Sequence, residues 1–386
     1  MPQSIRTAGA AQRRTVLRVM FLCSAALAGC SGGGSDASPT TPLSDDLVPR
    51  ADSSAYASRV PFWNGVYLGD AETTPERVAG AIGEFAALTG KRPALVKSFH
   101  RLDADLSQAG WAGRVLHAVQ GAGATNYVAL DLDWEGRAEG SLLDAINRGE
   151  ADARIDRAAR GIALVRGIIL VEAGWEMNGK SAYAWQGIAN GADRNAPAKY
   201  VAAARRLVDR FRAAGASNVR WVFNPNTGNA LAAPGIGSSH WNWYANYYPG
   251  DEYVDFVGAH GFNGPRAFGS PYHSFVEMFN GVDADRILTD MKQRFPTKPI
   301  LFGEIGAEEV AGHDKGAWVR DAYDRMLRDP QIAGAVWFNM KKESDWRVNS
   351  SAASLAGYRA ALEPALVAER YDDSRVAGNA VMLARR

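Results

Sequence analysis

The amino-acid sequence predicts a single α/β domain of the (β/α)8 TIM-barrel class. Short apolar runs alternate with longer amphipathic stretches along residues 55–370 of the 386-residue chain. Eight such β-then-α units fit a barrel, because each of its eight parallel strands is followed by a helix. A segment of this length is also in the usual range for one barrel domain. The pattern alone leaves a doubly wound sheet open as the alternative.

The candidate strands are the apolar runs themselves. In chain order they lie at 65–68, 94–99, 127–132, 167–173, 219–223, 254–259, 299–303 and 334–338. Between them, apolar residues recur three and four positions apart, which is the spacing of a helix with one buried face. The clearest helical segments are 75–88, 199–213 and 316–327. In a barrel of this order, the active site lies at the carboxyl ends of the strands.

Residues 1–29 have the pattern of a lipoprotein signal peptide. Four arginines and no acidic residue precede an apolar run at 19–29, which is shorter than the roughly 20 residues that span a bilayer. The run ends in Leu27-Ala28-Gly29-Cys30, which resembles the lipobox of bacterial lipoproteins, and its arginines also resemble a twin-arginine export signal. We expect Cys30 to carry lipid and to anchor the protein at the outer membrane, or in the periplasm or at the cell surface. An ordinary signal peptide with a chance cysteine is the alternative.

The segments that flank the domain are polar. Residues 30–54 are rich in Gly, Ser, Asp, Pro and Thr, so we expect a flexible linker between the lipid and the domain. Residues 371–386 have the composition of a polar C-terminal tail. Of the two cysteines, Cys23 lies in the segment to be removed and Cys30 would carry lipid. The mature domain therefore has no thiol for a disulfide or a metal site.

Charge and motif spacing argue against several classes of function. The formal net charge of +1 depends on the arginines of the signal segment, so nothing suggests a nucleic-acid partner. Glycine-rich phosphate loops are missing. No two of the six histidines have ligand spacing on one helix, so we expect no metal and no cofactor. We also expect a monomer.

Two of the predicted strands finish in a glutamate beside glycine. The fourth continues into Gly174-Trp175-Glu176-Met177-Asn178-Gly179, and the seventh ends in Gly303-Glu304-Ile305-Gly306. A carboxylate at a strand end is costly to desolvate unless it has partners or a task. Because the two strands are three positions apart around a barrel, their glutamates can face each other across its mouth.

These two segments resemble the motifs of glycoside hydrolase family 26, whose members are mostly endo-β-1,4-mannanases with some β-glucanases and xylanases. Segments 218–226, 247–258 and 345–351 resemble the same family in the same order, and the match is good from the fourth strand onward. The resemblance implies a retaining glycosidase in which Glu304 is the nucleophile and Glu176 the acid/base. It also implies a polysaccharide substrate, β-1,4-mannan by family default, and a substrate-binding role for Asn178 and Asn224.

The sequence departs from the family close to these glutamates. Trp175 replaces the usual histidine, Glu172 replaces an arginine, and His260 and Phe262 replace an aspartate and a tyrosine. Phe262 cannot supply the hydroxyl that contacts the nucleophile, so His260 is the candidate replacement. These changes leave the reaction type standing but favour a β-glucan or an exopolysaccharide almost as much as mannan.

A buried glutamate at position 172 needs a cation. Alternation along the strand places Glu172 on the same face as Glu176, deeper in the barrel. Lys97 on the second strand is the candidate partner, and we expect a structural ion pair rather than a catalytic role.

Several further residues near strand ends are candidates for contact with sugar. Sugar rings have an apolar face on which aromatic side chains stack. Trp337 at the end of the eighth strand is the candidate floor of the reacting subsite. The other candidate substrate-binding residues are Trp175, Tyr183, Trp185, His260, Phe262, His100 and Asp131.

Two other interpretations stay open. The segment Leu130-Asp131-Leu132-Asp133-Trp134-Glu135 resembles the acidic signature of family 18 chitinases, in which Glu135 would be the acid. However, this motif ends the third strand by our count, whereas the chitinases carry it on the fourth. A non-catalytic lipoprotein that binds polysaccharide in the cleft is the second alternative.

Overall fold

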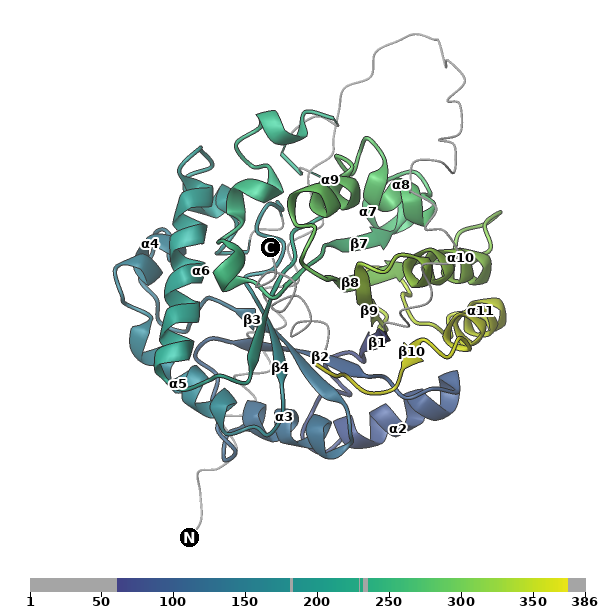
Figure 1. The fold of residues 1–386 in the computed structure, drawn as a ribbon, viewed down its shortest axis with the longest axis horizontal. Coiled ribbons are helices and arrows are strands. Elements are labelled where there is room, and N and C mark those ends of the chain that lie inside the picture. The colour runs from purple at the N-terminus through teal and green to yellow at the C-terminus, as the bar shows by residue number, and fades with distance from the viewer. Residues whose placement is uncertain (1–60, 181–182, 229, 232–234, 374–386) are drawn as a thin grey trace.

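The computed structural model describes residues 61–180, 183–228, 230–231 and 235–373, and these form one closed barrel of parallel strands with helices outside (Figure 1). The strands pair in chain order around the ring, and β9 returns to pair with β1. The predicted (β/α)8 barrel is therefore confirmed, and the doubly wound sheet is excluded. The predicted leader, Cys30 and linker lie outside the described residues.

The elements follow the order expected from the sequence. The strands are β1 Phe62–Tyr67, β2 Leu95–Arg101, β3 Thr125–Asp131, β4 Ile169–Ala173, β5 Val219–Phe223, β6 Phe256–Val257, β7 His260–Asn263, β8 Ile300–Ala307, β9 Ile332–Phe338 and β10 Val367–Ala368. The α-helices are α2 Val78–Thr89, α3 Trp111–Gly121, α4 Leu142–Asn147, α5 Asp152–Ala163, α6 Ala196–Ala213, α7 Pro265–Phe268, α8 Phe275–Asn280, α9 Ile287–Arg294, α10 Lys315–Arg328 and α11 Ala352–Leu362. Short 3-10 helices lie at η3 Gly187–Asn190, η4 Gly237–Ser239, η5 Tyr244–Tyr247 and η6 Asp251–Tyr253. All eight predicted strands overlap observed ones, with β6 and β7 sharing the sixth position.

The barrel interior changes character from bottom to top. Its lower part is a separate apolar cluster that includes Trp63, Leu95, Leu170, Val222 and Leu301. Because side chains alternate along a strand, the next inward positions lie one layer higher. That layer is polar, and an aromatic cluster with Tyr67, Phe338 and Trp346 lies near it. The apolar layer thus closes the barrel beneath a charged centre.

The sixth barrel strand is interrupted at Gly258, between β6 and β7. A Cβ on Gly258 would lie 2.0 Å from the carbonyl oxygen of Leu301 and 2.5 Å from Oδ1 of Asn224. Only glycine allows the strand to pass so close to β8. Beyond the interruption, β7 pairs with β8 so that His260 lies opposite Glu304.

The C-terminal segment closes the opposite end of the barrel. β10 pairs with β1, and the ring of Tyr371 lies 4.5 Å from that of Trp63. Arg220 on β5 forms an ion pair with Asp373, with 3.0 Å between Nε and Oδ1. Residues 371–373 therefore pack on the barrel and are not part of the polar tail predicted to begin at Tyr371. Among the described residues, no helix is both long and apolar enough to cross a membrane.

Candidate active site

The two predicted catalytic glutamates lie at the same barrel mouth. Glu304 is in β8 and is almost buried, whereas Glu176 lies just beyond β4 and is half-buried. Nδ1 of His260 is 2.9 Å from Oε1 of Glu176 and 3.9 Å from Oε2 of Glu304. Because both carboxyl groups approach one ring nitrogen, they face the same small space. Two carboxyl groups around one small space are the arrangement that glycosidases use.

The backbone at Glu176 is held in an unusual conformation. Its φ is 53°, in the left-handed region that non-glycine residues seldom occupy. The amide N–H of Glu176 donates to the carbonyl oxygen of Asn224 at 2.9 Å, and Nε2 of Gln186 donates to the carbonyl oxygen of Glu176 at 2.9 Å. Strain of this kind persists only where the surroundings impose it, and it clusters at functional sites.

A buried cation lies between two carboxylates. Nζ of Lys97 is 2.7 Å from Oε1 of Glu172 and 2.8 Å from Oε1 of Glu304, and Lys97 is fully buried. The predicted ion pair with Glu172 is thus present, and Lys97 also contacts the candidate nucleophile, which the sequence did not indicate. Burial lowers the pKa of Lys97, but the two carboxylates outweigh it and leave the pKa above its ordinary value. Lys97 therefore remains a cation.

Oε2 of Glu172 accepts three hydrogen bonds. It is 2.6 Å from the hydroxyl of Tyr127, 2.7 Å from Nδ2 of Asn224 and 3.1 Å from Nε2 of His260. Burial raises the pKa of Glu172, but Lys97 and then His260 more than offset this and bring the pKa well below its ordinary value. Glu172 is accordingly an ionised anchor for the layer beneath Glu176 and Glu304.

Gly303 makes room for this anchor. A Cβ at position 303 would lie 2.3 Å from Oε2 of Glu172, 2.3 Å from Nδ2 of Asn224 and 2.6 Å from Nε2 of His260. The glycine before Glu304 in the sequence motif is therefore required by the polar centre and not by a turn.

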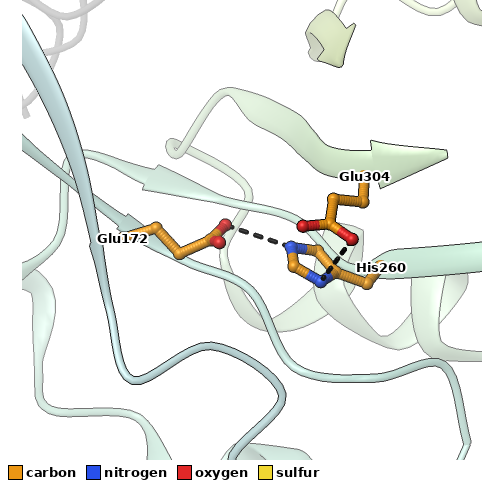
Figure 2. A group of neighbouring side chains, drawn as sticks. All are labelled: Glu172, His260 and Glu304. Carbon is orange, nitrogen blue, oxygen red and sulfur yellow. Dashed lines mark hydrogen bonds and ion pairs between the residues drawn. The ribbon is translucent and has the colours of Figure 1, made fainter. Parts of the chain in front are cut away.

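Glu172, His260 and Glu304 have the spacing of a metal site but not its charge. Figure 2 shows the His260 ring between the two carboxyl groups, and the possible ligand atoms lie within 4.8 Å of one another. The ammonium of Lys97 already contacts both carboxylates at 2.7 and 2.8 Å. A metal ion here would have to displace or repel that buried cation, so these residues do not fit a metal.

The aromatic residues after Glu176 pack against one another. The rings of Tyr183 and Trp185 stack at 4.8 Å, and Trp175 lies 4.6 Å from Trp185 and 5.2 Å from Phe99. Nε1 of Trp185 donates to the carbonyl oxygen of Trp175 at 2.7 Å. Trp175 and Trp185 are buried, so of these three residues Tyr183 has the largest surface for a sugar.

Trp337 is not at the mouth of the barrel. It is fully buried on the outer face of β9, where its ring contacts Trp318 on α10 and Tyr358 on α11. Because side chains alternate along the strand, its neighbour Phe338 points inward instead. The predicted sugar floor at Trp337 is therefore wrong: the sequence shows where the strand ends but not which face its last residues occupy. The half-buried Phe262, 5.2 Å from Trp346, lies with the inward aromatic cluster.

Asn178 and His100 are engaged by the protein itself. The side chain of Asn178 accepts from the amide of Asn226 at 2.8 Å and donates to the carbonyl oxygen of Gly228 at 3.0 Å, which ties two loops together. His100 is buried with Nε2 3.0 Å from Oγ of Ser98, and burial lowers the pKa of His100 to about 4. Both side chains thus have positions that account for them without a sugar.

The carboxylates after β3 differ from the catalytic pair. Asp131 is half-buried at the end of β3, and burial raises the pKa of Asp131 to about 7. Glu135 is exposed, and its backbone amide donates to Asp103 at 2.7 Å. Asp131 keeps its place as a candidate sugar contact, whereas the position of Glu135 does not support the chitinase interpretation.

The comparison with curated proteins finds one relative among glycan-degrading enzymes. No family model matches the chain. The chain is 35% identical over 285 residues to Endoglucanase H of Acetivibrio thermocellus. The matched segment is 73% of this chain and 29% of that protein. The chain thus spans less than a third of the length of this relative.

Solved structures with the same fold include several mannanases. An endo-β-1,4-mannanase from Cellulomonas fimi has a TM-score of 0.56 at 17% identity, covering 80% of this chain and 72% of that one. A catalytic domain from Bacillus sp. JAMB-750 has a TM-score of 0.58 at 19% identity, with coverage of 80% and 87%. A β-mannanase from Bacteroides ovatus has a TM-score of 0.58 at 14% identity, with coverage of 82% and 93%. The resemblance found in the sequence is confirmed in the architecture, and the chain has the fold of family 26 glycoside hydrolases.

Proposed function

We propose that the protein is a retaining endo-β-glycanase. The observation that carries the proposal is the pair of carboxyl groups, Glu176 and Glu304, that face each other at the carboxyl ends of β4 and β8 around His260. Two carboxyl groups at close range are the machinery of double-displacement glycoside hydrolysis. The similarity to an endoglucanase and to family 26 mannanases supports the same reaction.

We assign a different role to each glutamate. Glu304, paired with the Lys97 ammonium at 2.8 Å, is held as the anion that attacks the anomeric carbon. As that bond forms, the glycosidic C–O bond breaks and Glu176 gives its proton to the leaving oxygen. In the second step water attacks the same carbon, Glu176 accepts a proton from that water, and the bond to Glu304 breaks.

The substrate is a β-linked polysaccharide. Mannan is the default of the structural neighbours, whereas the relative with the higher identity carries the name of an endoglucanase. His260 lies beside both carboxyl groups, so the replacements at His260 and Phe262 would change recognition of the reacting sugar. We therefore place a β-glucan or a glucose- or mannose-containing exopolysaccharide beside mannan as substrate.

A reducing-end assay on a polysaccharide panel tests the proposal. The panel contains mannan, glucomannan, mixed-linkage glucan, xylan, chitin and bacterial exopolysaccharides, and Glu304→Gln is the matched isosteric control. We expect cleavage of one β-linked glycan that disappears in Glu304→Gln. If the native protein cleaves none of them but both proteins bind one, the protein is instead a polysaccharide-binding protein.

We also propose that the enzyme acts as a monomer tethered to the outer membrane, in the periplasm or at the cell surface, through lipid on Cys30. The support is the lipobox-like sequence Leu27-Ala28-Gly29-Cys30 and the polar linker that follows it. We expect fatty-acid labelling of the native protein and none of Cys30→Ala. A labelled Cys30→Ala protein would contradict the anchor.

A further inference from the structure

His260 lies among charged groups from three other strands. Glu172 belongs to β4, Glu176 follows β4, Glu304 belongs to β8, and Lys97 on β2 has its Nζ 3.5 Å from Nε2 of His260. The ring itself is fully buried. It therefore has three carboxyl groups and one competing cation as its immediate electrostatic surroundings.

Both ring nitrogens of His260 face carboxyl oxygens, which is the arrangement that a doubly protonated ring requires. Nε2 faces Oε2 of the ionised Glu172 at 3.1 Å, so this nitrogen must donate. Nδ1 faces Oε1 of Glu176 at 2.9 Å. Burial lowers the pKa of His260, but Glu172 and then Glu304 raise it to about 9, which keeps both N–H groups at neutral pH.

The bond to Glu176 has a directional consequence. When Glu176 carries the acid proton, the oxygen that accepts from Nδ1–H can only be its carbonyl oxygen, because an imidazolium has only donors. Oε1 of Glu176 is thereby occupied, and the acid proton is confined to Oε2. A general acid is effective only when its proton points at the leaving oxygen.

The negative charge of the catalytic pair moves during the reaction. Before attack it resides on Glu304; in the glycosyl-enzyme it resides on Glu176, because Glu304 is then esterified and Glu176 has lost its proton. Lys97 contacts Glu304 and Glu172. Nδ1 of His260 instead lies beside both members of the catalytic pair, at 2.9 and 3.9 Å.

We propose that His260 is a positioning residue whose charged ring directs the catalytic proton to Oε2 of Glu176 and remains the partner of the negative charge as it passes from Glu304 to Glu176. This inference rests on the proposed function. The family tyrosine that Phe262 replaces could not perform this task, because its hydroxyl carries no charge.

The pH dependence of kcat/KM in His260→Gln tests the proposal. Loss of a nearby cation raises the pKa of a carboxyl group, so Glu176 should stay protonated to higher pH and the basic limb should move upward by at least about one unit. His313→Gln, which removes an exposed histidine, is the matched control and should leave the limb in place. A folded, active His260→Gln protein with the wild-type limb would overturn the proposal.

Nitrogen-15 NMR of histidine-labelled protein gives a second readout that does not depend on folding of the variant. We expect both ring nitrogens of His260 to be protonated at pH 7 in the native protein and in Glu304→Gln, which imitates the uncharged ester. His100, whose pKa is lowered to about 4, should give a neutral ring in the same spectra. A neutral His260 ring in either protein overturns the proposal, whereas a native protein silent on every glycan overturns the proposed function itself.

Discussion

The position of single charges decides what the centre of this barrel can do. Lys97, Glu172 and Glu304 form a buried triad in which one ammonium serves two carboxylates at 2.7 and 2.8 Å. A buried charge is tolerated only with such partners. We therefore expect the lysine to be necessary for the stability of the fold.

Lys97→Met should lower the free energy of unfolding by about 3–5 kcal/mol, because it leaves two buried carboxylates without their shared cation. Lys199→Met is the matched control, since it breaks a half-exposed pair with Asp144 that is worth at most about 1 kcal/mol. Urea unfolding of both variants measures the difference, and equal losses would contradict the importance assigned to Lys97.

Stability should also fall above neutral pH. The folded-state pKa of His260 is raised to about 9, above the ordinary value near 6.5, so its contribution is fully present below about pH 6.5 and is lost as the pH rises through 9. We expect the Tm of the native protein to decline between these values more steeply than that of His260→Gln. Parallel Tm curves for the two proteins would show that the ring is not charged in the folded state.

At the scale of elements, the sequence predicted where each strand ends but not which face of the strand each residue occupies. Apolar runs located all eight strands, and glutamates beside glycine located the two carboxyl groups that meet at the barrel mouth. The contact of Lys97 with Glu304 and the outward face of Trp337 depend on barrel register, which pairs residues far apart in sequence. Tyr127 donates to Oε2 of Glu172 together with Asn224 and His260. The sequence did not indicate this role, because a tyrosine in an apolar strand resembles any core aromatic residue.

Gly303→Ala should destabilise the protein by about 1–3 kcal/mol, because the new methyl group meets the carboxylate of Glu172 at 2.3 Å and the centre must shift. Gly83→Ala in α2 is the contrasting change, since its Cβ meets nothing within 4 Å and alanine favours a helix by about 0.5–1 kcal/mol. Thermal unfolding of both variants should therefore show shifts of opposite sign.

Trp337→Ala should cost about 3–5 kcal/mol of stability and leave KM nearly unchanged, because the ring packs between β9 and the helices α10 and α11. Tyr183→Ala should instead raise KM with little loss of stability, because Tyr183 is the candidate sugar contact. Kinetics at a temperature where both variants are folded separate the two effects, and a raised KM in Trp337→Ala alone would restore the sugar floor.

On the scale of the whole molecule, the proposed active site and the C-terminal segment that covers the barrel lie at opposite ends. The proposed catalytic pair lies toward the carboxyl ends of the strands, whereas the rings of Tyr371 and Trp63 are in contact at the other end. The sequence predicted one barrel domain, but composition could not show that residues 371–373 belong to it, because they are as polar as the tail that follows.

Tyr371→Ala should lower the free energy of unfolding by about 1–3 kcal/mol through lost burial and the lost ring contact with Trp63, with kcat and KM unchanged. Urea unfolding and the reducing-end assay measure the two quantities on the same preparation. A loss of activity in a fully folded Tyr371→Ala protein would contradict the separation of the two ends.

The pairing of the first strand with the last two sets an order of events in time. β1 is synthesised before the other described strands, yet two of its neighbours, β9 and β10, are synthesised after them. Contacts between such distant segments form slowly, because the whole intervening chain must first be brought together. The nascent chain therefore cannot close its barrel until β9 has emerged, and until then it lacks a finished active site.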